Sequence, residues 1–188
     1  MDIKEKAQQY AQNKVQQVLN DAIADAYMEG YRQGLKDSDA HVPAVANDDP
    51  DVEFVDLGLP SGTLWAKDYL RKDGEIVYLP YLEAKKYKIP TKEQFDELIN
   101  SCSRDNCFNS LKEYSGKMFI GRNGNSIQII KKGYFKGDKK VDNSYVCKFW
   151  LQNNESEHTD RITSYLSKES SSTSTSFMGY KLPVLLVK

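Results

Sequence analysis

The late part of the chain gathers aromatic, amide and basic side chains of the kinds that bind sugars or protein surfaces. Residues 143–154 are predicted to form a strand that runs into a polar loop. Aromatic rings offer apolar faces, and amide and ammonium groups donate hydrogen bonds. The candidate ligand-binding residues are Tyr145, Lys148, Trp150, Gln152, Asn153, Asn154 and His158. A buried position in the core is the alternative for Trp150.

The groups that nucleophilic catalysis or zinc binding would need are sparse. His41 lies in an acidic, proline-containing stretch and His158 in a polar one, so a Ser–His or Cys–His pair would have to use His158. Cys102, Cys107 and Cys147 lack the paired spacing of a zinc site. Three cysteines cannot all pair with one another, so we expect reduced, structural thiols.

Two carboxylates fall on a predicted helix, and we interpret them as capping or solvated groups. Glu93 belongs to its first turn and Glu97 to the next, without a second feature that would make them a catalytic pair. Asparagine and aspartate between 153 and 160 could hold a cation, but no arrangement of ligands is evident. The sequence therefore predicts no enzymatic activity, no cofactor and no metal site.

Composition narrows the classes of partner. The chain has 188 residues and a formal net charge of −1, and its residues 1–50 carry nine acidic and five basic side chains. No part is basic enough to predict nucleic acid as a partner. No run of eighteen apolar residues predicts membrane insertion. The first residues lack the apolar core of a secretory signal, so we expect synthesis in the cytoplasm without export.

Residues 1–36 are predicted to form a long amphipathic helix. Small apolar residues recur there at spacings of three and four, the period of one helix face. The stripe consists of Ala7, Ala11, Val15, Val18, Ala22 and Ala26. Such a stripe suits packing against a partner, so we predict a docking or oligomerisation segment; folding back onto its own domain is the alternative. Residues 37–51 are predicted to be a flexible linker, and residues 52–188 a separate domain.

Several local signals organise residues 52–188. The turn Leu59-Pro60-Ser61-Gly62 joins two short apolar runs and predicts a hairpin, with Trp65 in the core. Thr91 followed by Gln94 is a capping box that begins a core helix. Asn123-Gly124 predicts a second hairpin within 116–132. Residues 162–167 are predicted to form a strand, and the Ser/Thr-rich 168–176 a hairpin loop. These elements favour an α+β class with an antiparallel sheet.

Four segments also resemble a known family. Residues 55–66, 89–100, 124–129 and 179–184 resemble the motifs of FISUMP-type modules, which are similar to C-type-lectin-like domains. The resemblance covers about residues 52–188. It implies a C-type-lectin-like twisted antiparallel sheet with one core helix, preceded here by the long N-terminal helix. The chain departs from the pattern between 67 and 88, and Leu182 stands where the family has arginine. The Glu-Pro-Asn and Trp-Asn-Asp triplets of calcium-dependent lectins are absent.

The resemblance implies a function of binding or assembly. Related proteins without an export signal resemble structural proteins of phages that infect gut anaerobes. We therefore expect a non-catalytic recognition or decoration module that residues 1–36 anchor to a homo-oligomer or larger particle, such as a virion, with a glycan or host surface as ligand. An exported bacterial adhesin and a formylglycine-generating-type enzyme are the alternatives.

Overall fold

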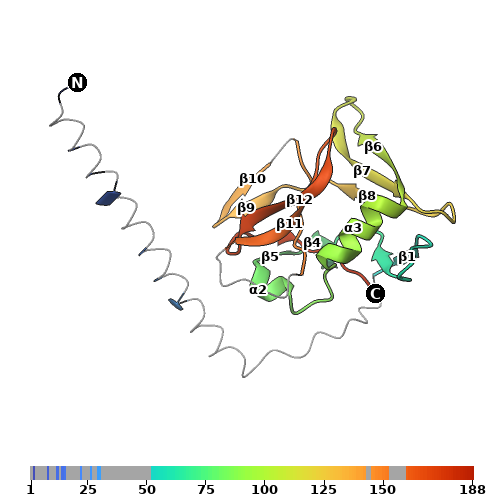
Figure 1. Ribbon diagram of the computed structural model, residues 1–188, viewed down its shortest axis with the longest axis horizontal. Helices are drawn as coiled ribbons and strands as arrows, with labels where there is room; N and C mark the ends of the chain where they lie inside the picture. The colour runs from blue at the N-terminus through green and yellow to red at the C-terminus, as the bar shows by residue number, and fades with distance from the viewer. Residues whose placement is uncertain are drawn as a thin grey trace. The chain divides into compact units, whose positions relative to one another are not determined.

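The computed structural model describes residues 52–142, 145–152 and 160–188 and, nearer the N-terminus, a few single residues (Figure 1). Those single residues are Asp2, Gln8, Gln12, Lys14, Val15, Ala22, Ala26, Glu29 and Gly30. The chain divides into two units, Met1–Ala44 and Val45–Lys188. Every strand and helix named below belongs to the second unit. The predicted linker, 37–51, lies outside the described residues, as do Ala7, Ala11 and Val18 of the predicted stripe.

The predicted fold class is wrong, because the described part of the chain is mainly β. It forms small antiparallel sheets and two short helices, and no long N-terminal helix is among these elements. Within Met1–Ala44, separate residues such as Val15 have helical backbone, but Val15 is 69% exposed. Apolar periodicity shows which face of a helix could be buried, whereas packing of that face supplies most helix stability in proteins. The Val15 side chain lacks such packing.

The second unit begins with short hairpins and two helices and then continues as longer strands. Its first elements are β1 (Phe54–Asp56), β2 (Leu64–Ala66), β3 (Arg71–Lys72), β4 (Glu75–Ile76), β5 (Tyr78–Leu79), α2 (Tyr81–Ala84) and α3 (Lys92–Ser101). The later ones are β6 (Ser103–Phe108), β7 (Tyr114–Ile120), β8 (Ser126–Ile130), β9 (Tyr134–Lys136), β10 (Lys139–Val141), β11 (Asp160–Leu166), β12 (Ser171–Phe177) and β13 (Leu182–Pro183).

The predicted opening hairpin is confirmed, and the end of the chain pairs beside it. β1 and β2 are antiparallel, with Val55 opposite Trp65, and Gly62 N–H donates to Leu59 O across the turn at 2.9 Å. On its other side β2 exchanges hydrogen bonds with the C-terminal residues, since Leu64 and Lys188 bond reciprocally at 3.0 and 2.9 Å. Trp65 is 0% exposed and is a core residue, as predicted.

The capping box of α3 is also confirmed, and this helix holds the opening turn. Gln94 N–H donates to Thr91 Oγ1 at 3.2 Å, and Thr91 N–H donates to the Gln94 side chain at 2.9 Å. The Glu97 carboxylate accepts hydrogen bonds from Ser61 N–H at 2.8 Å and from the Ser61 hydroxyl at 2.5 Å. Glu97 therefore links helix and turn, although its role was predicted only as capping or solvated.

The Asn-Gly hairpin forms where the sequence predicts it. β6, β7 and β8 make a three-stranded antiparallel sheet, and Gly124 has a positive φ of 85° in the turn between β7 and β8. The side chains of Asn123 and Asn125 both donate to Asp56 O at 2.9 Å. These bonds attach the turn to the end of β1.

The Ser/Thr-rich segment 168–176 was predicted to be a loop, and this prediction is wrong. Residues 171–177 form β12, which pairs with β11 along its whole length. On its other edge β11 bonds to residues 147–151, for example through Cys147 N–H to Leu166 O at 2.8 Å. The buried hydroxyl of Ser176 on β12 accepts a hydrogen bond from Lys148 Nζ at 3.5 Å. Short polar residues can therefore form a strand that the sequence describes only as low in complexity.

Candidate ligand-binding site

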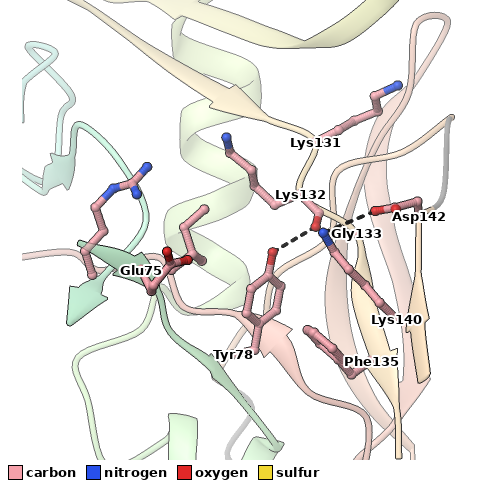
Figure 2. A pocket seen from close by; sticks show the side chains of 10 residues that line it. Glu75, Tyr78, Lys131, Lys132, Gly133, Phe135, Lys140 and Asp142 are labelled. Carbon is pink, nitrogen blue, oxygen red and sulfur yellow. Dashed lines mark hydrogen bonds and ion pairs between the residues drawn. The ribbon is translucent and has the colours of Figure 1, made fainter. Parts of the chain in front are cut away.

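A cavity among the described residues lies where two hairpins meet the end of β8. It has a volume of about 620 Å³ and is open to solvent. Figure 2 shows its walls, which come from the β3–β4 hairpin, β5, the residues after β8 and the β9–β10 hairpin. The lining residues are Arg71, Glu75, Ile76, Tyr78, Lys131, Lys132, Gly133, Phe135, Lys140 and Asp142.

The β3–β4 hairpin fixes a guanidinium at one side of the cavity. Asp73 and Gly74 both have positive φ, 53° and 83°, as a two-residue turn of this kind requires. Arg71 donates to Asp68 Oδ2 from Nε at 3.0 Å and from Nη2 at 2.9 Å, and to Gly74 O from Nη1 at 2.8 Å. Three hydrogen bonds therefore hold this planar cation in one orientation.

An aromatic pair lines the cavity between the two hairpins. The rings of Tyr78 and Phe135 meet edge to face, with centroids 5.0 Å apart. The Tyr78 hydroxyl donates to Lys132 O at 2.8 Å, shown as a dashed line in Figure 2. Burial, followed by the nearby Asp142 and Glu75 carboxylates, raises the pKa of Tyr78. Its hydroxyl is therefore protonated at neutral pH and serves as a donor.

The wall formed by the residues after β8 and by the β9–β10 hairpin is basic. Lys140 pairs with Asp142 at 3.4 Å, whereas among the described residues no carboxylate pairs with the Lys132 ammonium. Gly133, with a φ of 71°, turns the chain between these lysines. A Cβ on Gly133 would lie 2.7 Å from Val141 O, so only glycine lets the two segments approach this closely.

This arrangement combines the groups that recognise polyhydroxylated ligands. The ring pair offers an apolar surface, the ammonium and guanidinium groups donate hydrogen bonds, and the Glu75 and Asp142 carboxylates accept them. This lining is suited to binding such a ligand.

Trp150, a candidate ligand-binding residue, is placed in the core. It is 1% exposed, its indole N–H donates to Leu79 O at 2.8 Å, and its ring packs edge to face on Tyr81. A ligand on the surface cannot reach this ring, so its inclusion in the site is corrected. Its neighbours Phe149 and Leu151 are both 0% exposed, so this segment is buried on both of its sides.

The other candidate residues are not brought together in one site by the described part of the structure. Tyr145 is 76% exposed and borders a separate cavity of about 490 Å³ with Glu113, Tyr114, Lys131, Lys168 and Glu169. Lys148 is half-buried and donates to Ser176 Oγ at 3.5 Å. Burial, with a further effect of Lys136, lowers its pKa. Gln152 bonds through its backbone to Pro90 O. Asn153, Asn154 and His158 lie outside the described residues.

The three thiols are free, and burial raises the pKa of each. Cys147 is the deepest; its thiol donates to Ile129 O at 3.3 Å, and its pKa rises to about 12. The pKa values of Cys102 and Cys107 are raised first by burial and then by Glu97 and Asp105 respectively. In the ranges that the structure describes, no three histidine, cysteine or carboxylate side chains are grouped to hold a metal ion.

The residues of the cavity were missed at the sequence level. The available signal was charge: residues 131–140 contain five lysines and one aspartate. Their pairing with Arg71 and Tyr78 depends on contacts between segments about sixty residues apart. No helix among the described residues is long and apolar enough to span a membrane. Comparison with protein families, with characterised proteins and with solved structures finds no match to this chain.

Proposed function

We propose that residues 52–188 form a non-catalytic recognition module that binds a saccharide in the cavity between the β3–β4 and β9–β10 hairpins. The observation that carries this proposal is the pairing of the Tyr78–Phe135 rings with donors and acceptors in one open cavity. Sugars present apolar C–H faces between hydroxyl groups, and such a lining complements both. The resemblance to FISUMP-type modules supports the same class of function.

We further propose that residues 1–36 attach this module to a larger assembly, of which a phage virion is the example that the resemblance implies. The described apolar residues Val15, Ala22 and Ala26 have helical backbone and are exposed. Contact with a second copy or with a particle protein would bury these side chains.

Binding of sugars to the full chain tests the recognition role. The protein is screened against immobilised neutral and acidic oligosaccharides, alongside the variants Phe135→Ala and Phe108→Ala. Phe108 is the matched control because it is 52% exposed and lies outside the cavity. We expect Phe135→Ala to weaken binding by about tenfold, the order of one aromatic contact, and Phe108→Ala to leave it unchanged. Absence of binding to any saccharide would refute the recognition role.

Mass in solution tests the assembly role. We expect the full chain to form an oligomer and a chain without residues 1–36 to be monomeric, measured by light scattering during size-exclusion chromatography. An equal subunit count for both chains would contradict attachment through this segment by self-association.

A further inference from the structure

The charge of the cavity specifies which saccharide it would take, an inference that rests on the proposed function. We propose that the cavity selects sugars that carry a carboxylate, with the Lys132 ammonium as the group that meets it. The proposal rests on the surplus of cations in the lining, the Lys132 ammonium that lacks a carboxylate partner among the described residues, and the carboxylates among the lining residues.

The lining has more cations than carboxylates. Four basic residues, Arg71, Lys131, Lys132 and Lys140, face two acidic residues, Glu75 and Asp142. Arg71 is already bonded to Asp68, and Lys140 to Asp142. The Lys132 side chain is only partly exposed and has no carboxylate partner among the described residues. An anionic ligand would supply that partner, and a charge-assisted hydrogen bond is stronger than a neutral one.

The backbone of Lys132 lies beside the rings that a sugar would contact. The Tyr78 hydroxyl donates a hydrogen bond to Lys132 O, which bonds the aromatic pair directly to the backbone of this lysine. In Figure 2 the Lys132 side chain extends from that backbone away from Phe135. A saccharide of several units would therefore rest one unit on the rings and present the carboxylate of another unit to the Lys132 ammonium.

The acidic residues of the cavity favour a sugar acid over nucleic acid. Glu75 and Asp142 lie within the same lining as the lysines. Duplex DNA carries one charge about every 1.7 Å along its axis, so these carboxylates would repel it. An acidic saccharide separates its charges by uncharged hydroxyl-bearing positions, and a carboxylate can accept hydrogen bonds from those hydroxyls.

The experiment compares two sugars that differ only in charge. The probes are a tetrasaccharide with alternating glucuronic acid and the same tetrasaccharide after reduction of each carboxyl to the alcohol. Binding to the full chain is measured by titration calorimetry at low and at physiological salt. We expect the acidic form to bind at least about tenfold more tightly, as one charge-assisted hydrogen bond predicts, and added salt to reduce this preference.

Two lysine variants assign the preference to one side chain. Lys132→Gln is expected to bind both forms with similar affinity, and Lys132→Arg to retain the preference for the acid. Lys139→Gln is the matched control, because it removes the same charge from the same basic segment but from a side chain outside the cavity lining. It should keep the full preference. A Lys132→Gln variant that also keeps it would overturn the assignment.

The outcomes separate this inference from the proposed function. Equal binding of the acidic and reduced sugars by the unmodified chain overturns the selection for carboxylates and leaves saccharide recognition standing. Failure of every saccharide in the screen refutes recognition itself. A single-stranded oligonucleotide of equal charge that displaces the acidic sugar would also overturn the inference, because the attraction would then be unspecific. The comparison on the unmodified chain decides the result even if a lysine variant is unstable.

Discussion

Gly121, directly after β7, lies so close to the backbone of the segment after β1 that no side chain fits there. A Cβ added there would lie 2.0 Å from Leu57 O, a backbone atom of the segment after β1. We expect Gly121→Ala to lower the free energy of unfolding by about 2 kcal/mol or more, because backbone must move to admit the methyl group.

Urea unfolding measures this cost, with Gly62→Ala as the control. Gly62 has a φ of 71° but open space around its Cβ position, so alanine there should cost only about 1 kcal/mol, the strain of left-handed backbone. If Gly121→Ala lowers the free energy of unfolding no more than Gly62→Ala does, the close approach of Gly121 to the backbone of Leu57 is not as described.

The raised pKa of the Cys147 thiol predicts how the stability of the protein changes at alkaline pH. Burial raises its pKa from 9.0 to about 12, so the folded protein holds this proton more tightly than the unfolded chain. The contribution of the protonated thiol to the free energy of unfolding is therefore fully present below pH 9 and is lost as the pH rises toward 12. Between these values the unmodified protein should lose up to about 1.4 kcal/mol more per pH unit than Cys147→Ser.

Urea unfolding at several pH values between roughly 9.5 and 11 tests this difference. Subtracting the serine variant removes the contribution of the groups that titrate alike in both proteins. Parallel pH curves for the two proteins would show that the Cys147 thiol is not desolvated in the folded state.

At the level of single residues, the sequence predicts what depends on near neighbours. The Thr91–Gln94 capping box involves groups three residues apart, and positive φ at Gly124 belongs to one turn. Burial of Trp150 depends instead on partners that are distant in the sequence, such as Leu79, whose carbonyl accepts the indole hydrogen bond. The same limit applies to Glu97, whose bonds to Ser61 cross thirty-six positions.

At the level of elements, β11 depends on a buried hydroxyl. Ser164 is 0% exposed, and its Oγ accepts a hydrogen bond from Phe149 N–H at 3.0 Å. We expect Ser164→Ala to destabilise the protein by about 1–3 kcal/mol, because it leaves a buried N–H without an acceptor. Ser172→Ala, on the exposed face of β12, should change stability by less than about 0.5 kcal/mol.

Thermal and urea unfolding of the two alanine variants check this contrast. Similar stabilities of Ser164→Ala and Ser172→Ala would show that Phe149 N–H finds another partner. Serine and threonine are typical of loops because their hydroxyls compete for backbone groups, but here the Ser164 hydroxyl attaches β11 to the backbone of Phe149.

Elements were predictable where both strands and their turn lie close in sequence. The hairpins around Pro60 and Asn123 are of this type, and both were predicted correctly. The long N-terminal helix was not, because an apolar stripe establishes only the face that a partner could cover. Loop prediction for 168–176 failed for a different reason. Its partner β11 overlaps the predicted strand 162–167, but the serine and threonine residues of 168–176 are themselves typical of loops.

At the level of the whole molecule, the cavity could not be predicted from the sequence. Arg71, Tyr78, Lys132 and Lys140 come from four segments. The pairing of β5 with β13, the bridge between Phe135 and Lys181 and the Tyr78–Lys132 hydrogen bond bring them to one place. The basic segment 131–140 is visible in the sequence, but its aromatic neighbours are not. Charge pattern therefore indicates that an anion could bind, whereas the fold decides what else the ligand meets.

The pairing of the last residues with β2 leads to a prediction about truncating either end of the chain. The last residues pair with β2 and bury Leu186 and Val187, which are 6% and 2% exposed. Removing residues 186–188 should cost about 3 kcal/mol or more, since full burial of each such side chain contributes about 1.5–3 kcal/mol. Removing residues 1–44 deletes the whole first unit and should leave the unfolding midpoint of the second nearly unchanged.

Calorimetric unfolding of the two truncated chains distinguishes the roles of these ends. We expect one cooperative transition after removal of 1–44, at the temperature seen in the full chain, and a lowered or absent transition after removal of 186–188. Three residues would then matter more to the second unit than forty-four, because the three complete the sheet around Trp65. A large loss of stability on removing 1–44 would instead show that the first unit stabilises the second, and residues 1–36 could not be a separate attachment segment.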